Sequence, residues 1–281
     1  MGASALTPAV TAATILRVLE DNLIAKKICN TDYTGEIKQA GDRVIFGGLE
    51  PVAVGNYTGA DITYENISSA DLTLLVDQQK YYGFAVTDIE QAQDMLSKKN
   101  SQIKNAAYQL AKTADTYVLG LYAQAAANAA AITDATCDDD SILGDIALLA
   151  RYLDENNVPD GQRWLVIPPW VKMMLNLAGI QFQINDGISG TGGMAFAKEL
   201  GFDIYVSNNL YNSGTAAAPV HSVLAGSYNA IGFADQVLKN EVLRSPTKFQ
   251  DNCRGLYTFG SKVLKPKELA LATLTYSAPT L

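Results

Sequence analysis

The fold is decided by one long stretch of the chain, Ile89–Ala131, which reads IEQAQDMLSKKNSQIKNAAYQLAKTADTYVLGLYAQAAANAAA. This stretch contains no proline, and its single glycine is Gly120. Small and apolar residues recur in it at steps of three or four, as they do along one face of a helix: Ile103, Ala107, Leu110, Ala114, Val118, Leu121 and Ala125. The pattern predicts one continuous amphipathic helix of roughly 60 Å, longer than a typical small domain is wide.

The segment before this helix, Gly47–Val76, is extended and polar in character. Its apolar residues alternate only in short pieces, which Gly55-Asn56 and Ser68-Ser69 interrupt. Because so few apolar positions cannot bury a core of their own, the segment is predicted to be a two-stranded arm that projects from the body and contacts another subunit. Directly upstream, a turn at Gly41-Asp42 precedes a predicted strand that begins at Val44.

The N-terminal residues carry one helix signal. Thr7 is suited to the N-cap and Pro8 to the first helical position. An apolar stripe follows, made of Ile15, Leu16, Leu19, Leu23 and Ile24. A helix this isolated needs a partner surface.

After the long helix the pattern changes to alternating helices and strands. Helices are predicted at Ile142–Asn156 and from Pro169 to Leu177, and strands at Arg163–Ile167, Phe202–Val206 and Val220–Leu224. From Val237 onward the sequence is rich in strand signals. These features together indicate an α+β protein.

Composition excludes several classes of protein. The chain has 281 residues, 48% hydrophobic content and a formal net charge of -8, which favours a folded protein over a disordered one. No apolar run approaches the length of a membrane span, and no secretory signal is recognisable. The scattered Cys29, Cys137 and Cys253 are predicted to be reduced thiols, not a disulfide framework or a zinc site. The basic residues form no cluster that indicates nucleic-acid binding.

Histidine chemistry would have to be built on one residue, because His221 is the only histidine. It lies in PVHSVLAG, an apolar strand with no nucleophile elbow nearby. We interpret it as a structural histidine, so a catalytic triad, a Cys-His dyad and a histidine metal site are not expected.

Two further motifs imitate ligand sites. GISGTGGMAF, Gly187–Phe196, partly matches a dinucleotide fingerprint, but it lacks a preceding first strand, a downstream acidic residue and the lysine of a P-loop. It is interpreted as a surface loop. The run Asp138–Asp140 lacks the spacing of a calcium loop and is interpreted as solvated charge that favours the start of the next helix. No catalytic, cofactor-binding or metal-binding residue is therefore assigned, and no enzyme activity is expected.

Several collinear pieces of sequence resemble the major capsid proteins of tailed bacteriophages with the Hong Kong 97-type fold. They are NTDYTGEIKQAGDRVIF, the run from Asp61 to Gln93, RWLVIPPW, GFDIYVSNNL, and the close from Leu224 to Leu274. The resemblance covers nearly the whole chain.

The resemblance implies a division of the chain into an N-terminal arm (1–40), an extended loop (47–76), a peripheral domain with a spine helix (77–131 and 237–281), and an α/β axial domain (132–236). It also implies pentamers and hexamers that tile an icosahedral shell around double-stranded DNA, in the virion and, before assembly, in the host cytoplasm. The chain starts directly with the arm, so a separate scaffolding protein and a portal are the expected partners, with no membrane and no cofactor. No cross-linking residue is carried over.

Three alternatives stay open at this stage. One is an encapsulin-like compartment shell of the same fold, which would need a pocket for cargo tails. Another is a surface-array protein, which would need an export signal. The third is a nicotinamide-dependent oxidoreductase built on Gly190–Ala195, which a nucleotide-binding assay would detect.

Overall fold

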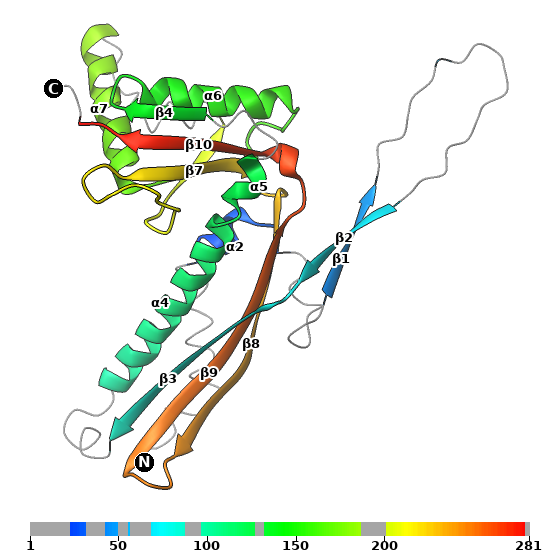
Figure 1. Cartoon of the computed structure of the whole chain (residues 1–281), viewed down its shortest axis with the longest axis vertical. Coiled ribbons are helices and arrows are strands. Elements are labelled where there is room, and N and C mark those ends of the chain that lie inside the picture. The colour runs from blue at the N-terminus through cyan, green and yellow to red at the C-terminus, as the bar shows by residue number, and fades with distance from the viewer. Residues whose placement is uncertain are drawn as a thin grey trace.

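The computed structural model describes residues 23–31, 43–49, 56, 69–87, 97–126, 132–186 and 201–278. Two β-sheets with their helices make up most of this part of the chain, and a separate pair of strands lies beside them (Figure 1). The α+β class is therefore confirmed. Among these residues, no helix combines the length and the apolar character that a membrane span requires.

The first sheet, here called the mixed sheet, contains parallel and antiparallel pairs in the order β4-β10-β7-β5-β6. Its strands are β4 (Ile132–Cys137), β10 (Leu269–Tyr276), β7 (Val220–Ser227), β5 (Arg163–Ile167) and β6 (Phe202–Val206). Every residue of β5 is buried because both faces of the sheet are covered.

The two faces of the mixed sheet belong to different hydrophobic cores. Leu165 and Ile167 of β5 pack with the helices α6 (Ile142–Glu155) and α7 (Pro169–Asp186). Trp164 and Val166, which point the other way along the same strand, belong to the core that also contains the long helix. The mixed sheet is thus the layer that separates the two cores.

The second sheet, here called the antiparallel sheet, has the order β3-β9-β8. Its long strands are β3 (Gln78–Thr87), β9 (Gln250–Val263) and β8 (Ile231–Arg244), and α4 (Ser97–Leu119) runs along them in Figure 1. The helix buries the face that its periodicity predicted: Ile103, Ala107, Leu110, Ala114 and Val118 are all at most 6% exposed. That prediction is confirmed.

The prediction of one continuous helix over Ile89–Ala131 is wrong at its C-terminal end. The helix α4 ends at Leu119, and a short helix α5 (Tyr122–Ala126) follows. After Gly120 the backbone hydrogen bonding changes to the spacing of a 3-10 turn, because the N–H of Leu121 donates to the carbonyl of Val118, three residues earlier, at 3.1 Å. Glycine weakens a helix at this point, and the chain turns there. Residues 88–96 and 127–131 lie outside the described part.

The arm consists of β1 (Arg43–Leu49) and β2 (Ser69–Leu75), which pair antiparallel in register from Arg43 with Leu75 to Leu49 with Ser69. The predicted strand at Val44 is therefore confirmed, but pairing begins at Arg43, earlier than the Gly47 boundary. Between the strands only Asn56 is described.

The division drawn from sequence differs from the structure in two places. The last strand, β10, was grouped with the peripheral part (237–281), but it pairs with β4 and β7 in the mixed sheet. The boundary at 236 falls inside β8, which belongs to the antiparallel sheet from Ile231 onward. In addition, β4 follows directly after the bounds of the predicted helix and was not expected as a strand.

Candidate assembly interface

The base of the arm is fixed against the antiparallel sheet. At Gly260 of β9 the two backbones touch, because an added Cβ would collide with the carbonyl oxygen of Leu75 and lie 2.9 Å from the Cα of Val76. Two positions further along, Lys262 donates its ammonium to the carbonyl of Thr73 at 2.9 Å. Leu74 and Val76 are fully buried, whereas Leu75 is 56% exposed. The arm therefore leaves the body from a rigid base.

One row of residues locks the three strands of the antiparallel sheet together. Tyr82, Gly255 and Asn240 lie opposite one another in register. The Tyr82 ring lies over Gly255, where a Cβ would come within 2.7 Å of the ring carbon Cζ, and its hydroxyl donates to Asn240 Oδ1 at 2.7 Å. Burial is the main cause that raises the pKa of Tyr82 to about 12, so the hydroxyl stays protonated as a donor.

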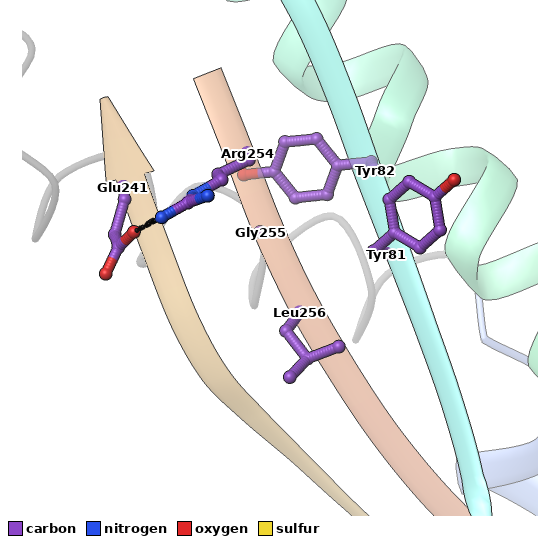
Figure 2. Close-up of a pocket in the computed structure, with 6 residues that line it drawn as sticks. All are labelled: Tyr81, Tyr82, Glu241, Arg254, Gly255 and Leu256. Carbon is purple, nitrogen blue, oxygen red and sulfur yellow. Dashed lines mark hydrogen bonds and ion pairs between the residues drawn. The ribbon is translucent and has the colours of Figure 1, made fainter. Parts of the chain in front are cut away.

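Beside this row the sheet has an exposed hollow of about 300 Å³ (Figure 2). Its lining includes Tyr81, whose side chain is 83% exposed, and Leu256. Figure 2 also shows the ion pair between Arg254 and Glu241, in which the guanidinium and the carboxylate approach to 2.7 Å. An aromatic ring and an aliphatic side chain beside a charge pair are typical of protein contact surfaces.

A second hollow, of about 440 Å³, lies between α4 and the β3 edge of the antiparallel sheet. Lys80 of β3 and Lys112 of α4 both line it, together with glutamine and threonine side chains. We call it the lysine groove. Its two ammonium groups suit an acidic occupant.

The described part of the N-terminal segment docks on its own body. The helix α2 (Ala25–Ile28) begins beneath the carboxylate of Asp115 in α4, which accepts the N–H of Ala25 at 2.9 Å and that of Ile24 at 3.3 Å. Asp115 is 3% exposed, and burial raises its pKa to about 6 against the opposing effect of these hydrogen bonds. The helix predicted to start at Thr7 lies almost wholly outside the described residues.

Two further contacts hold this segment. The ammonium of Lys26 lies 2.9 Å from Asp235 Oδ2, which also accepts the hydroxyl of Tyr257 at 3.0 Å. The N–H of Asn30 donates to the carbonyl of Ile231, and the carbonyl of Asn30 accepts the N–H of Phe233. The segment thus adds one strand-like residue to the end of β8.

The candidates for chemistry have structural partners. His221 of β7 accepts the indole N–H of Trp170 at 3.0 Å, and burial lowers its pKa. The carboxylate of Asp138 accepts the N–H of Asp140 and of Ser141, which organises the start of α6. The interpretation of Asp138–Asp140 as solvated charge is wrong for Asp139, which is 1% exposed.

The remaining candidates from the sequence are the three cysteines and the glycine-rich segment. Cys29, Cys137 and Cys253 are all buried, and none forms a disulfide, as predicted. Gly187–Phe196, with the alternative fingerprint Gly190–Ala195, lies outside the described residues. Sequence reasoning missed Asp115, whose position beside Ala114 of the apolar stripe indicated burial but not a cap.

The comparisons agree with this architecture. A family model described as phage capsid protein matches residues 69–271. No curated protein matches the chain. Among solved structures, a chain from Mycobacterium phage Che8 is 24% identical with a TM-score of 0.68, covering 88% of this chain and 89% of that one.

Two more solved structures have the same fold. The capsid of the cyanophage P-SCSP1u is 19% identical with a TM-score of 0.64, over 87% of this chain and 85% of that one. The virus-like particle from Pyrococcus furiosus is 13% identical with a TM-score of 0.60, over 93% and 97%. With the family model matched over most of its length, the chain belongs to the phage capsid protein family and has the Hong Kong 97-type α+β fold.

Proposed function

We propose that the chain is the major coat subunit of a tailed phage, which assembles into pentamers and hexamers of an icosahedral head around double-stranded DNA. The observation that carries the proposal is the arm, whose strands pair only with each other among the described residues and project from a rigid base at Gly260 (Figure 1). A two-stranded ribbon is marginal by itself and gains stability by lying on another surface. The mixed sheet with α6 and α7 corresponds to the axial domain, and the antiparallel sheet with α4 to the peripheral domain.

The neighbouring subunit's lysine groove is the proposed landing place of the arm. Between Arg43 and Lys80 the sequence contains five acidic residues and no basic one: Glu50, Asp61, Glu65, Asp71 and Asp77. Lys80 and Lys112 offer the complementary charge. Opposite charges across an interface favour the correct register and suppress wrong partners.

A charge-swap experiment tests this contact. In co-expression with the scaffolding protein, the double substitution Lys80→Glu with Lys112→Glu should leave the subunit folded but abolish closed shells, as seen by negative-stain microscopy. Adding Asp61→Lys with Glu65→Lys to the same chain should restore them. The matched control reverses two exposed lysines elsewhere, Lys172 and Lys267. Normal shells from the first double variant, or their loss in the control, would contradict the proposed landing place.

Deleting the segment that connects the two strands of the arm tests the proposal as a whole. Replacing residues 50–68 by a two-residue turn should give a soluble subunit that forms no shells. The strands β1 and β2 would still pair, but the segment proposed to contact the neighbouring subunit would be missing. Sedimentation and microscopy compare the deletion variant with the full-length chain. Closed particles of normal size from the deletion variant would contradict an assembly role for the arm.

The remaining parts of the proposal concern partners and location. A separate scaffolding protein and a portal are the proposed assembly partners, and the subunit acts as a structural component and not as an enzyme. It is made in the host cytoplasm and ends in the virion. Co-expression with candidate scaffolding proteins should convert irregular products into closed heads of one size.

A compartment shell is the second candidate function. It is supported by the likeness to the virus-like particle from Pyrococcus furiosus, which extends over 97% of that chain. The two functions differ in what assembly requires. Uniform closed particles from the purified chain alone, without any scaffolding protein, would favour the compartment.

A further inference from the structure

Three side chains at the start of the α6 region gather their donor atoms into a small space. They are Asp134 and Cys137 of β4 and Asp145 in the first turn of α6, and one donor atom from each lies within 4.8 Å of the others. β4 is an edge strand of the mixed sheet, and the chain passes directly from it into α6. The cluster therefore joins an edge strand to the helix that follows it.

Hydrogen bonds in the connecting turn orient the cluster. Ser141 Oγ donates to Asp134 Oδ2 at 2.8 Å, and the N–H of Thr136 donates to Asp134 Oδ1 at 2.9 Å. Asp138 Oδ1 accepts the N–H of Ser141 at 2.9 Å, which fixes the turn itself. Carboxylates that are oriented in this way by further hydrogen bonds are typical of metal ligands.

The electrostatics of the cluster are unbalanced. Asp145 is only 8% exposed, and its Oδ2 has no hydrogen-bond partner among the described residues. A buried carboxylate oxygen without a donor is costly. The charged group beside Asp145 in the cluster is the acidic Asp134, and a cation is the group that would offset both carboxylates.

The donor set selects the kind of cation. Magnesium and calcium bind oxygen ligands, whereas a thiolate with carboxylates suits the borderline-soft divalent ions. We propose that Asp134, Cys137 and Asp145 bind one divalent cation of the zinc class, namely Zn²⁺, Co²⁺ or Cd²⁺. Three protein ligands leave a fourth tetrahedral position for water, and the half-buried Asp134 provides the path of entry. The bound ion ties the β4 edge to α6.

Cobalt spectroscopy on the full chain tests the thiolate ligand. Adding Co²⁺ to the full-length subunit should produce a thiolate-to-cobalt charge-transfer band that Zn²⁺ then removes. Cys137→Ser should abolish the band, while Cys253→Ser and Cys29→Ser, at the other two buried thiols, should leave it unchanged. No band in the folded wild-type chain, or a band that persists in Cys137→Ser, overturns the proposal.

Thermal denaturation tests the carboxylate ligand. Zn²⁺ should raise the Tm of the wild-type chain in a concentration-dependent way, as any ligand specific for the folded state does. Asp145→Asn should weaken Zn²⁺ binding by no less than about 100-fold, the upper end of the loss from removing an outer-shell partner. If Asp134 and Asp145 instead share a proton, Asp145→Asn will raise the Tm without metal and Zn²⁺ will shift neither chain, which overturns the proposal.

Discussion

Asp115 caps a helix that lies 90 residues before it in the chain, because its Oδ1 accepts the N–H of Ala25 at 2.9 Å. The carboxylate thus serves as a tertiary N-cap and fixes the N-terminal segment to the long helix α4. A side chain in the middle of one helix therefore caps the start of another helix, whereas the N-cap is ordinarily a Ser, Thr or Asp next to the helix in sequence.

Removing this cap should loosen the segment before it unfolds the body. Asp115→Ala leaves the N–H groups of Ile24 and Ala25 without their acceptor, which should lower the free energy of unfolding by about 1–3 kcal/mol. Asp115→Asn keeps one carbonyl oxygen and should lose less. Chemical denaturation measures the stability, and amide exchange at residues 23–31 locates the loss. Equal exchange in wild type and Asp115→Ala would contradict the cap.

The same carboxyl predicts a pH dependence. The pKa of Asp115 is about 6 in the folded chain, above its ordinary value of 3.8, so the folded state binds more protons between these values. The free energy of unfolding should therefore fall as pH rises from 4 to 7, by an amount on the order of 3 kcal/mol at most. Asp115→Asn should remove this part of the pH dependence. Denaturant titrations of both chains across this pH range measure the difference between their free energies of unfolding. That difference should not vary with pH if the carboxyl does not titrate there.

Gly260 permits the close approach that positions the arm. Gly260→Ala should destabilise the subunit by several kcal/mol or displace the arm, because the added methyl group meets backbone atoms of Leu75 and Val76 that cannot move separately. The control is Gly144→Ala in α6, where an added Cβ has no atom within 4 Å. That change should stabilise by about 0.5–1 kcal/mol, as alanine for glycine does in a helix. Thermal melts of the two variants should move in opposite directions.

The buried face of α4 can be tested with two adjacent residues. Leu110 is 6% exposed, so Leu110→Asp buries a charge without a partner and should cost several kcal/mol. Gln109 is exposed and lines the lysine groove, so Gln109→Asp buries no charge and should change stability by less than about 0.5 kcal/mol. Circular dichroism melts compare the two variants. Wild-type stability in Leu110→Asp would contradict the packing of α4 on the antiparallel sheet.

The isolated subunit should bind double-stranded DNA no better than about 0.1 mM at physiological salt, because its net charge of -8 repels phosphates. Residual contact should come from separate basic residues of the N-terminal segment, such as Arg17 and Lys27. Lys26 should contribute less, because its ammonium is paired with Asp235 at 2.9 Å. Gel-shift titration decides the matter. Micromolar binding that survives 0.2 M salt would show a protein that condenses nucleic acid instead of enclosing it passively.

The elements that sequence predicted well are those whose pattern depends on local burial. The apolar run Arg163–Ile167 is a strand with the predicted bounds, and the stripe from Ile103 to Val118 is the buried face of α4. In both cases the apolar pattern within the segment itself determines which face of the helix or strand is buried.

The features that sequence did not predict depend on distant parts of the chain. β10 has the same alternating apolar pattern whichever sheet it joins, and only its pairing with β4 and β7 decides. The three ligands of the proposed cation site are separated by a turn, so their spacing matches no standard metal motif. Asp115 caps a helix with which it shares no local sequence signal.

The position of β10 also bears on how the protein is made. It is the last described strand to leave the ribosome, yet it lies inside the mixed sheet, between β4 and β7. During translation, the facing edges of β4 and β7 therefore stay unpaired until residues 269–276 emerge. Chains that terminate early lack the strand that joins both edges. Only chains that include β10 can complete the sheet, so products interrupted before it should be left out of the growing shell.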